Sequence, residues 1–111
     1  MSRILITGAS TGLGLEMHKA LSAAGHDVQS YDLSNGFDVR KPNAAYIADL
    51  RQRGLDVLIN NAGINLINWL ERFEEDDWDK VMDTNAKGIY LMSKACLPAL
   101  KDSKGTILNI V

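Results

Sequence analysis

The amino-acid sequence predicts an α/β domain in which a doubly wound parallel sheet carries helices on both faces. Short apolar runs alternate with longer segments of helical periodicity along all 111 residues. Glycine or polar turn residues separate these runs. Strands that alternate with helices pair in parallel, because each helix returns the chain to the same end of the sheet. We therefore expect one domain over residues 1–111, with a sheet of about five strands.

The composition is that of a globular domain and narrows the possible partners. Hydrophobic residues make up 46% and charged residues 23%, which is enough for a packed core. The net charge is −2 and no segment gathers Lys and Arg, which argues against nucleic acid and against anionic membranes. The single cysteine, Cys96, excludes an internal disulfide and fits a reducing compartment. Because the N-terminal apolar run is too short for a signal peptide or anchor, we expect a cytoplasmic location.

The first half of the chain contains three candidate strands and one candidate helix. In order they are a strand at 3–6, a helix at 13–24, a strand at 28–31 and a short strand at 37–39. Leu13, Met17 and Leu21 share one face of the helix, and Gly25 stands at its C-terminal cap position. The turn residues Ser34-Asn35-Gly36 precede the third strand.

The second half continues the alternation. Pro42 is expected to open a helix that Gly54 ends, and the apolar run at 56–60 is expected to form the fourth strand. Acidic residues at 74–77 stand where a helix dipole favours negative charge, ahead of a long helix at 76–100. Its expected inner stripe is Trp78, Val81, Met82, Ile89, Met92, Cys96 and Leu100. A fifth, apolar strand follows at 106–111.

A glycine-rich run lies between the first strand and the first helix. It consists of Thr7, Gly8, Ala9, Ser10, Thr11, Gly12, Leu13 and Gly14. Glycines at such a junction let the backbone turn sharply and approach a phosphate closely, while the helix directs free N–H groups to the same point. The hydroxyls of Ser10 and Thr11 can cap the helix or contact the phosphate. The run predicts a pyrophosphate site; the alternative is a tight turn without a ligand.

Asp32 ends the second strand, about 20 residues beyond the glycine run. An acidic residue at this distance can accept hydrogen bonds from the ribose hydroxyls of adenosine. Its charge would also repel a 2′-phosphate, and no Arg or Lys lies in the glycine run or directly after Asp32. The position favours NAD over NADP; the alternative is a solvated aspartate in a turn.

Together these residues resemble the signatures of the short-chain dehydrogenase/reductase family. They are, in the order of the family, Thr7-Gly8-x-x-x-Gly12-x-Gly14, Asp32, Asp38-Val39, Asn60-Asn61-Ala62-Gly63 and Asn85. The resemblance covers all 111 residues. It implies a Rossmann-type fold, an NAD(P) cofactor, and hydride transfer between an alcohol and a carbonyl compound.

The resemblance also implies roles for single residues. Asp38 and Val39 would border the adenine ring, with the aspartate facing the exocyclic amine. The cofactor would pass along Asn60, Ala62 and Gly63. Asn85 is similar to the asparagine of the family's catalytic tetrad, which supports a water linked to the active-site lysine. No metal site is expected, because His18 and His26 have no Cys or Asp at ligand spacing.

The serine and the Tyr-x-x-x-Lys pair of the family's chemistry would follow the strand at 106–111, where the sequence ends. Tyr90 and Lys94 match the spacing but precede that strand, so we interpret them as part of the long helix. We therefore expect a truncated domain that binds NAD but is inactive alone, with a sheet edge that favours self-association. The alternatives are an inactive remnant or sensor, and a split enzyme that another chain completes.

Overall fold

The structure, a computed structural model, describes residues 1–110 and has the expected α/β architecture. Its strands are β1 (Arg3–Thr7), β2 (Asp27–Tyr31), β3 (Val57–Asn60) and β4 (Thr106–Asn109). Its α-helices are α1 (Gly12–Ala23), α2 (Ala44–Arg53), α3 (Glu75–Met82) and α4 (Gly88–Ser103). Within residues 1–110 no helix combines the length and apolar character needed to cross a membrane.

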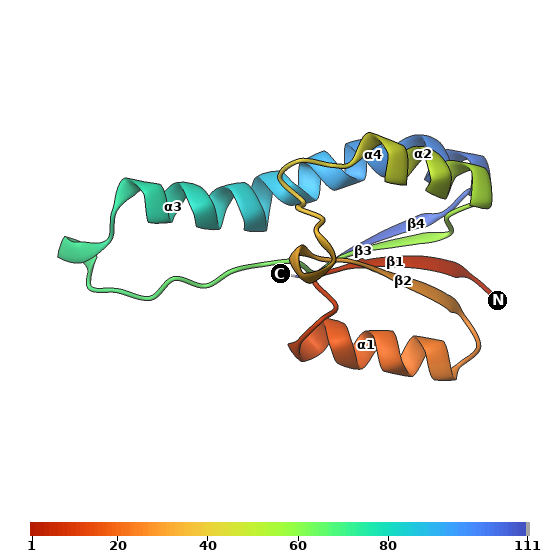
Figure 1. The fold of residues 1–111 in the computed structure, drawn as a ribbon, viewed down its shortest axis with the longest axis horizontal. Coiled ribbons are helices and arrows are strands. Elements are labelled where there is room, and N and C mark those ends of the chain that lie inside the picture. Colours follow the sequence, from red (N-terminus) through yellow and green to blue (C-terminus); the bar gives the residue numbers. More distant parts are fainter. Residues whose placement is uncertain (111) are drawn as a thin grey trace.

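The four strands form one parallel sheet in the order β2-β1-β3-β4. In Figure 1, α1 lies on one face of the sheet, and α2 and α4 lie on the other. The chain therefore winds in both directions from β1, as a doubly wound sheet does. All four strands end at the same edge, where the loops after β1, β2 and β3 meet.

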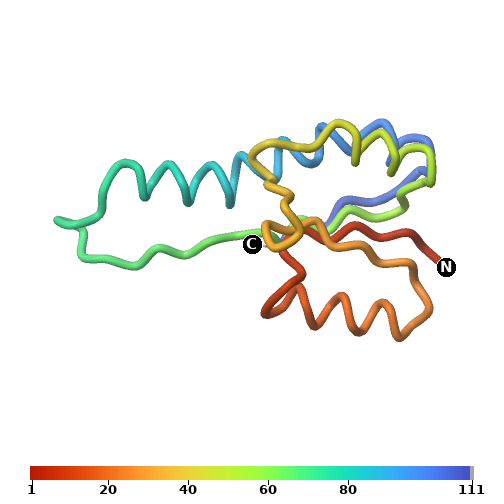
Figure 2. Tube along the Cα trace, viewed as in Figure 1, coloured from red at the N-terminus to blue at the C-terminus, as the bar shows by residue number. Residues whose placement is uncertain are grey.

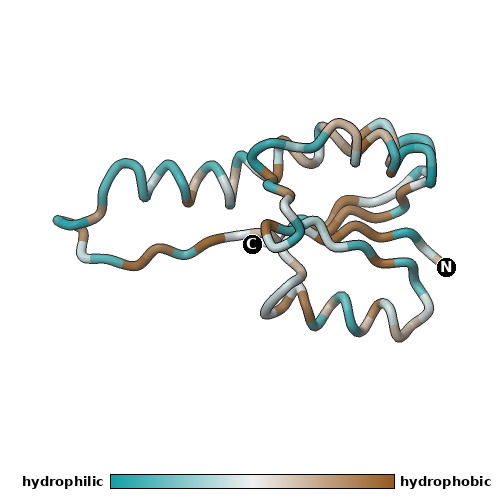
Figure 3. The backbone as a smooth tube through the Cα atoms, viewed as in Figure 1, coloured by the Kyte–Doolittle hydropathy of each residue, from teal (hydrophilic) through white to brown (hydrophobic). Residues whose placement is uncertain are grey.

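Two apolar clusters fill the space on the two faces of the sheet. The larger cluster lies beneath α2 and α4 and contains Leu5, Tyr31, Val39, Leu50, Leu55, Leu58, Met92, Cys96, Ala99 and Leu100. The smaller cluster contains Ile4, Ile6, Ala9 and Ile59, with Met17 and Leu21 of α1 packed against it. In Figure 3, hydrophobic stretches of neighbouring strands lie next to one another in the sheet. Alternate strand residues thus serve opposite faces, as a doubly covered sheet requires.

The third strand expected at 37–39 is absent from the part of the chain that the structure describes, so the sheet has four strands there. The backbone groups of this stretch are used locally instead. The N–H of Phe37 donates to the Asp32 carbonyl (3.0 Å), and Gly36 takes a left-handed φ of 81°. The Phe37 ring stacks on Tyr31 with 4.8 Å between ring centroids. A chain that folds back on itself in this way offers no extended edge for pairing.

The helix expected to open at Pro42 begins two residues later. Asn43 is the N-cap, and its Oδ1 accepts a hydrogen bond from the N–H of Tyr46 (2.9 Å). Asparagine satisfies a free N–H at this position, which proline cannot do with its side chain. Gly54 ends the helix as expected.

The long helix expected at 76–100 consists of α3 and α4, joined by a π-helical segment at Asp83–Lys87. Figures 1 and 2 show α3 and the preceding loop extending away from the sheet as an arm. The expected inner stripe is therefore only partly correct. Met92, Cys96 and Leu100 lie on α4 and are buried in the core, whereas Trp78 is 58% exposed because α3 has no sheet beneath it.

The last strand lies at one edge of the sheet, as expected. Among residues 1–110, β4 pairs with β3 alone, and its four residues are exposed. The expected strand included Val111, which lies outside the described residues.

Candidate functional site

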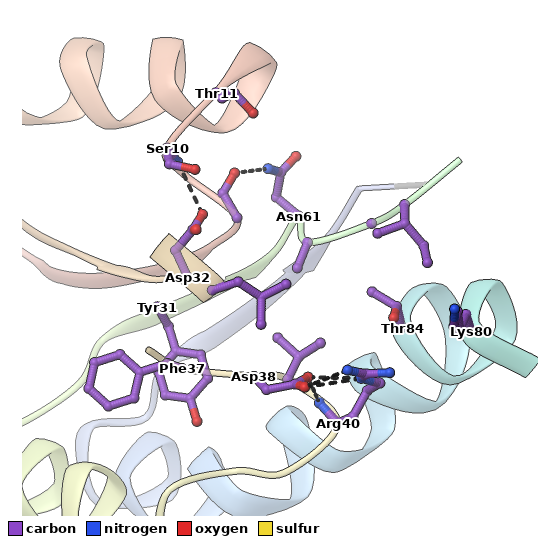
Figure 4. Close-up of a pocket in the computed structure, with 16 residues that line it drawn as sticks. Ser10, Thr11, Tyr31, Asp32, Phe37, Asp38, Arg40, Asn61, Lys80 and Thr84 are labelled. Carbon is purple, nitrogen blue, oxygen red and sulfur yellow. Dashed lines mark hydrogen bonds and ion pairs between the residues drawn. The ribbon is translucent and has the colours of Figure 1, made fainter. Parts of the chain in front are cut away.

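A cavity of about 500 Å³ lies at the carboxyl end of the sheet, between the loops after β1, β2 and β3 (Figure 4). Its lining comprises Gly8, Ser10, Thr11, Tyr31, Asp32, Leu33, Phe37, Asp38, Val39, Arg40, Asn61, Ala62, Gly63, Ile64, Lys80 and Thr84. This edge is where open parallel sheets bind their ligands. The lining is mixed, with apolar side chains between carboxylates, hydroxyls and amides.

Thr7 connects the loops after β1 and β3. Its buried hydroxyl oxygen accepts hydrogen bonds from the backbone N–H groups of Asn61 (3.0 Å) and Ala62 (2.9 Å). In return, Nδ2 of Asn61 donates to the carbonyl of Gly8 (3.0 Å). Three hydrogen bonds therefore fix one wall of the cavity between residues that are far apart in the sequence.

Two glycines of the run are required by close packing. Gly8 has φ +70°, and a Cβ on it would lie 2.8 Å from Cα of Ala62. A Cβ on Gly14 would overlap the Gly8 carbonyl oxygen and Nδ2 of Asn61. Any side chain at either position would push the two loops apart.

Gly12, at the start of α1, differs from these two glycines. It has φ +58°, but a Cβ on it would meet no atom within 4 Å. Thr11 is the N-cap and makes no side-chain capping hydrogen bond, and the first backbone bond of the helix runs from Leu15 N–H to the Thr11 carbonyl. The N–H groups at the start of α1 are thus left for a partner outside the helix, and the dipole favours an anion there.

Asp32 lies at the end of β2 and faces the glycine run. Its Oδ1 accepts from the N–H of Ser34 (2.8 Å), and its Oδ2 accepts from the N–H of Ser10 (3.2 Å). Burial would raise the pKa of this carboxyl group, but the hydrogen bonds from Ser34 and Ser10 outweigh burial, so its pKa lies below the ordinary value. Asp32 therefore places a fixed negative charge beside the start of α1.

Asp38 occupies the other end of the cavity and is paired with Arg40. Nε of Arg40 lies 3.1 Å from each carboxylate oxygen of Asp38, and Nη2 lies 2.8 Å from Oδ2. The side-chain hydrogen bonds from Arg40 hold the pKa of Asp38 below its ordinary value, although burial opposes them. Figure 4 shows this pair on the side of the cavity away from Ser10 and Thr11.

Asn85 holds the loop after β3 from the π-helical segment. Its Oδ1 accepts from the N–H of Ile64 and its Nδ2 donates to the Ile64 carbonyl, both at 2.8 Å. A Cβ on Gly63 would lie 3.2 Å from the same Oδ1, so the loop passes close to the amide. The wider turn of a π segment changes the direction of a side chain in an otherwise regular helix, and such segments are frequent at functional sites.

The structure brings together most of the residues that the sequence predicts for the site. Gly8, Ser10, Thr11, Asp32, Asp38, Val39, Ala62 and Gly63 all line the cavity. Gly12 and Leu13 open α1 beside it, and Gly14 packs beneath the loop. Asn60 is different: its buried Nδ2 donates to Oγ of Ser93 (3.1 Å) and to Oδ1 of Asn109 (2.9 Å). Its side chain joins β3 to α4 and β4 instead of lining the cavity.

Several lining residues were not among the predicted site residues. Arg40, Asn61, Lys80 and Thr84 all contribute to the wall. Asn61 could have been found from its place in the Asn-Asn-Ala-Gly motif. Lys80 and Thr84 carry no such signal, since only the path of the arm brings them to the cavity.

Tyr90 and Lys94 are neighbours on α4, with Nζ of Lys94 3.5 Å from the Tyr90 hydroxyl. Both side chains are exposed, and neither residue lines the cavity. Tyr31 does line it, but its hydroxyl accepts from the N–H of Asn43 (2.9 Å), and burial raises its pKa. Within residues 1–110 no group of three His, Cys, Asp or Glu side chains could hold a metal ion.

A parallel sheet, a glycine-rich turn into a helix and an acidic residue after the next strand are the features of a Rossmann-type fold. The family profile described as short chain dehydrogenase matches residues 37–111. The chain therefore belongs to the short-chain dehydrogenase family, whose members are oxidoreductases that use NAD or NADP.

Known proteins of several activities are similar to this chain. A 3-ketodihydrosphingosine reductase of Bacteroides thetaiotaomicron is 36% identical over 96% of this chain and 45% of its own length. Gluconate 5-dehydrogenase of Gluconobacter oxydans is 33% identical over 98% of this chain and 52% of its own length. The ligand-free structure of Thermoplasma acidophilum aldohexose dehydrogenase superposes with a TM-score of 0.85 at 25% identity, covering 97% of this chain and 48% of the other. The chain thus spans about half the length of these relatives.

Proposed function

We propose that this chain binds NAD in its cavity and forms the cofactor-binding part of an oxidoreductase that interconverts alcohols and carbonyl compounds. The observation that carries the proposal is the combination of an uncapped α1 with an ionised Asp32 beside it. The open space at Gly12 suits a phosphate that approaches the backbone. The residues therefore fit a dinucleotide.

Four parts of the site would match parts of the cofactor. The N–H groups at the start of α1 would bind the pyrophosphate, and Asp32 would accept hydrogen bonds from the adenosine ribose. Asp38 and Val39 would border the adenine, and Ala62 and Gly63 would face the second ribose. When bound, the nicotinamide ring gives or receives the hydride.

The preference for NAD over NADP rests on Asp32. A 2′-phosphate would meet a carboxylate whose lowered pKa keeps it charged. Titration of the chain with NADH and NADPH, followed by nicotinamide fluorescence, tests this. We expect NADH to bind at least about 10-fold more tightly, and Asp32→Ala to reduce that ratio. Asp49→Ala, on the exposed face of α2, is the control; equal affinity for the two cofactors in the unaltered chain would refute the preference.

We also propose that the 111 residues alone do not turn over substrate. In the family, the chemistry depends on a Ser and a Tyr-x-x-x-Lys pair, and the pair at Tyr90 and Lys94 stands outside the cavity. NADH consumption by the isolated chain with ketone or β-ketoester substrates would contradict this. The alternatives are a cofactor-binding remnant or sensor, and an enzyme that a second chain completes. NADH binding without turnover is expected for the proposed function and for both alternatives, and it would exclude an inert remnant that binds no cofactor.

We also propose that the chain is cytoplasmic and that its copies associate with one another through β4. β4 has an unpaired edge within the described chain, and Ile107 and Leu108 are 37% and 47% exposed. Exposed apolar edges favour pairing with another strand. Sedimentation velocity should show dimers or larger species, and Leu108→Lys should shift them toward monomer; a monodisperse monomer in the unaltered chain would contradict it.

A further inference from the structure

Gly88, the first residue of α4, packs directly against a residue of the cavity wall. A Cβ on Gly88 would lie 2.8 Å from Cγ2 of Val39 and 3.3 Å from its Cβ. Val39 is 7% exposed and lines the cavity. The small hollow that Val39 and Gly88 border has no room for a water molecule. A side chain at position 88 would therefore require either Val39 or α4 to move.

The backbone of Gly88 does not itself require glycine. Its φ of −59° and ψ of −39° are ordinary helical values, which any residue adopts. Glycine at such a position costs backbone entropy relative to alanine. The feature of the structure that accounts for glycine here is the close approach of Val39.

Of the two neighbours, Val39 is easier to displace than α4. Met92, Cys96 and Leu100 of α4 are buried in the larger apolar cluster, so a shift of the helix would disturb closely packed contacts along its length. Val39 lies in the irregular stretch between β2 and α2, which takes no part in the described sheet. The open space beside Val39 is the cavity of about 500 Å³ (Figure 4). A methyl group added at position 88 should thus push Val39 into the cavity.

We propose that Gly88 is a positioning residue, whose missing side chain lets Val39 stand back and keeps the cavity wide enough for a dinucleotide. The inference rests on the proposed binding of NAD. Gly88 is not among the residues that line the cavity, so it acts on the ligand only through Val39.

The experiment measures the NADH affinity and the structure of Gly88→Ala. Calorimetry on the full chain should show NADH binding on the order of 10-fold more weakly to this variant, because Val39 takes part of the space of the ligand. A crystal structure of the variant should show Val39 shifted toward the cavity while α4 keeps its place. Gly54→Ala is the matched control, since Gly54 has φ +94° and ends α2 outside the cavity. It should lower stability through backbone strain and leave the NADH affinity unchanged.

Truncation of Val39 shows whether Gly88 acts through it. Val39→Ala removes Cγ2, the atom that a Cβ at position 88 would approach most closely. Gly88→Ala added to Val39→Ala should therefore change the NADH affinity by less than about 2-fold. This comparison also decides the matter if Gly88→Ala alone does not fold, because the double variant lacks the closest contact. An equal loss of affinity in both backgrounds, or a double variant that does not fold although Val39→Ala does, would overturn the inference.

The outcomes separate this inference from the proposed function. No binding of NADH by the unaltered chain would overturn the proposed function and, with it, the role of Gly88 in binding. Unchanged NADH affinity in Gly88→Ala would overturn the role of Gly88 and leave the cofactor site standing. A crystal structure in which α4 moves and Val39 stays in place, or an equal loss of affinity in Gly54→Ala, would do the same.

Discussion

The wall of the cavity that β1 and β3 form is held between residues 54 and 55 positions apart, whereas the wall at Asp38 is held within two positions. The first wall consists of Thr7, Gly8, Asn61 and Ala62, and its hydrogen bonds exist only when two strands pair. The second wall consists of Asp38 and Arg40. We conclude that changes in the first wall should affect stability and binding together, and changes in the second should affect binding alone.

Gly8→Ala should give the largest effect in the first wall. It combines a positive φ with a Cβ 2.8 Å from Cα of Ala62, so about 1–2 kcal/mol of backbone strain adds to about 1–3 kcal/mol of overpacking. Gly12→Ala is the matched control, because it shares the positive φ but meets no atom. Urea unfolding should show a larger loss for Gly8→Ala, and equal losses would contradict the close approach. In Gly12→Ala, NADH binding should fall more than stability.

Thr7→Val should give the second-largest loss of stability. The substitution keeps the shape of the side chain but leaves two N–H groups, those of Asn61 and Ala62, without their acceptor. We expect a loss of about 2–4 kcal/mol in the free energy of unfolding, with weaker NADH binding. Thr7→Ser should recover most of it. Thr106→Val, on exposed β4, should change the free energy of unfolding by no more than about 0.5 kcal/mol. An equally small change for Thr7→Val would show that the Thr7 hydroxyl does not hold the two loops together.

Asn85→Ala should have a smaller, local effect. It removes two hydrogen bonds to the backbone of Ile64, each worth about 1 kcal/mol. Hydrogen exchange should become faster at the Ile64 amide while the amides of β1 keep their protection. Asn68→Ala, in the same loop, is the control; unchanged exchange at Ile64 in Asn85→Ala would show that the loop is held by other contacts.

The pH dependence of stability should show the smallest effect. The pKa of Asp32 is lowered in the folded chain, so its ionisation stabilises the fold above the ordinary Asp pKa of about 3.9. That contribution is lost as the pH falls from there through the folded pKa. The difference in unfolding free energy between the unaltered chain and Asp32→Asn should therefore shrink below about pH 4. An NMR titration that gives Asp32 an ordinary pKa would contradict it.

The sequence predicted the second wall less well than the first. Gly8, Asn61 and Ala62 belong to motifs that the sequence shows directly, because glycine and small polar residues directly after a strand indicate a tight turn or a close backbone approach. The stretch at 37–39 was wrongly expected to be a strand. Its apolar residues suit a strand, but the Asp32 carbonyl and the Tyr31 ring provide partners that no local pattern reveals.

Asn60 and Trp78 also show that a sequence pattern does not reveal the partner of a side chain, Asn60 in the site and Trp78 in the expected core. Asn60 belongs to a cofactor motif, yet its amide is used between β3, β4 and Ser93 of α4. Trp78 has helical spacing with Met82, yet both lie on an arm that leaves the sheet. Periodicity shows which residues share a face, but it does not show whether a neighbour covers that face.

The sequence by itself determined the parallel α/β class, the glycine run and the acidic residue beyond it, because these depend on local backbone freedom and the alternation of strands and helices. Only the tertiary structure decided the number of paired strands, the π segment that aims Asn85 at Ile64, and the hydrogen bonds of Asn60 to Ser93 and Asn109. These features arise from groups that find partners only when distant segments meet or the chain folds back. The glycine run thus marks the site, and the fold determines which side chains surround it.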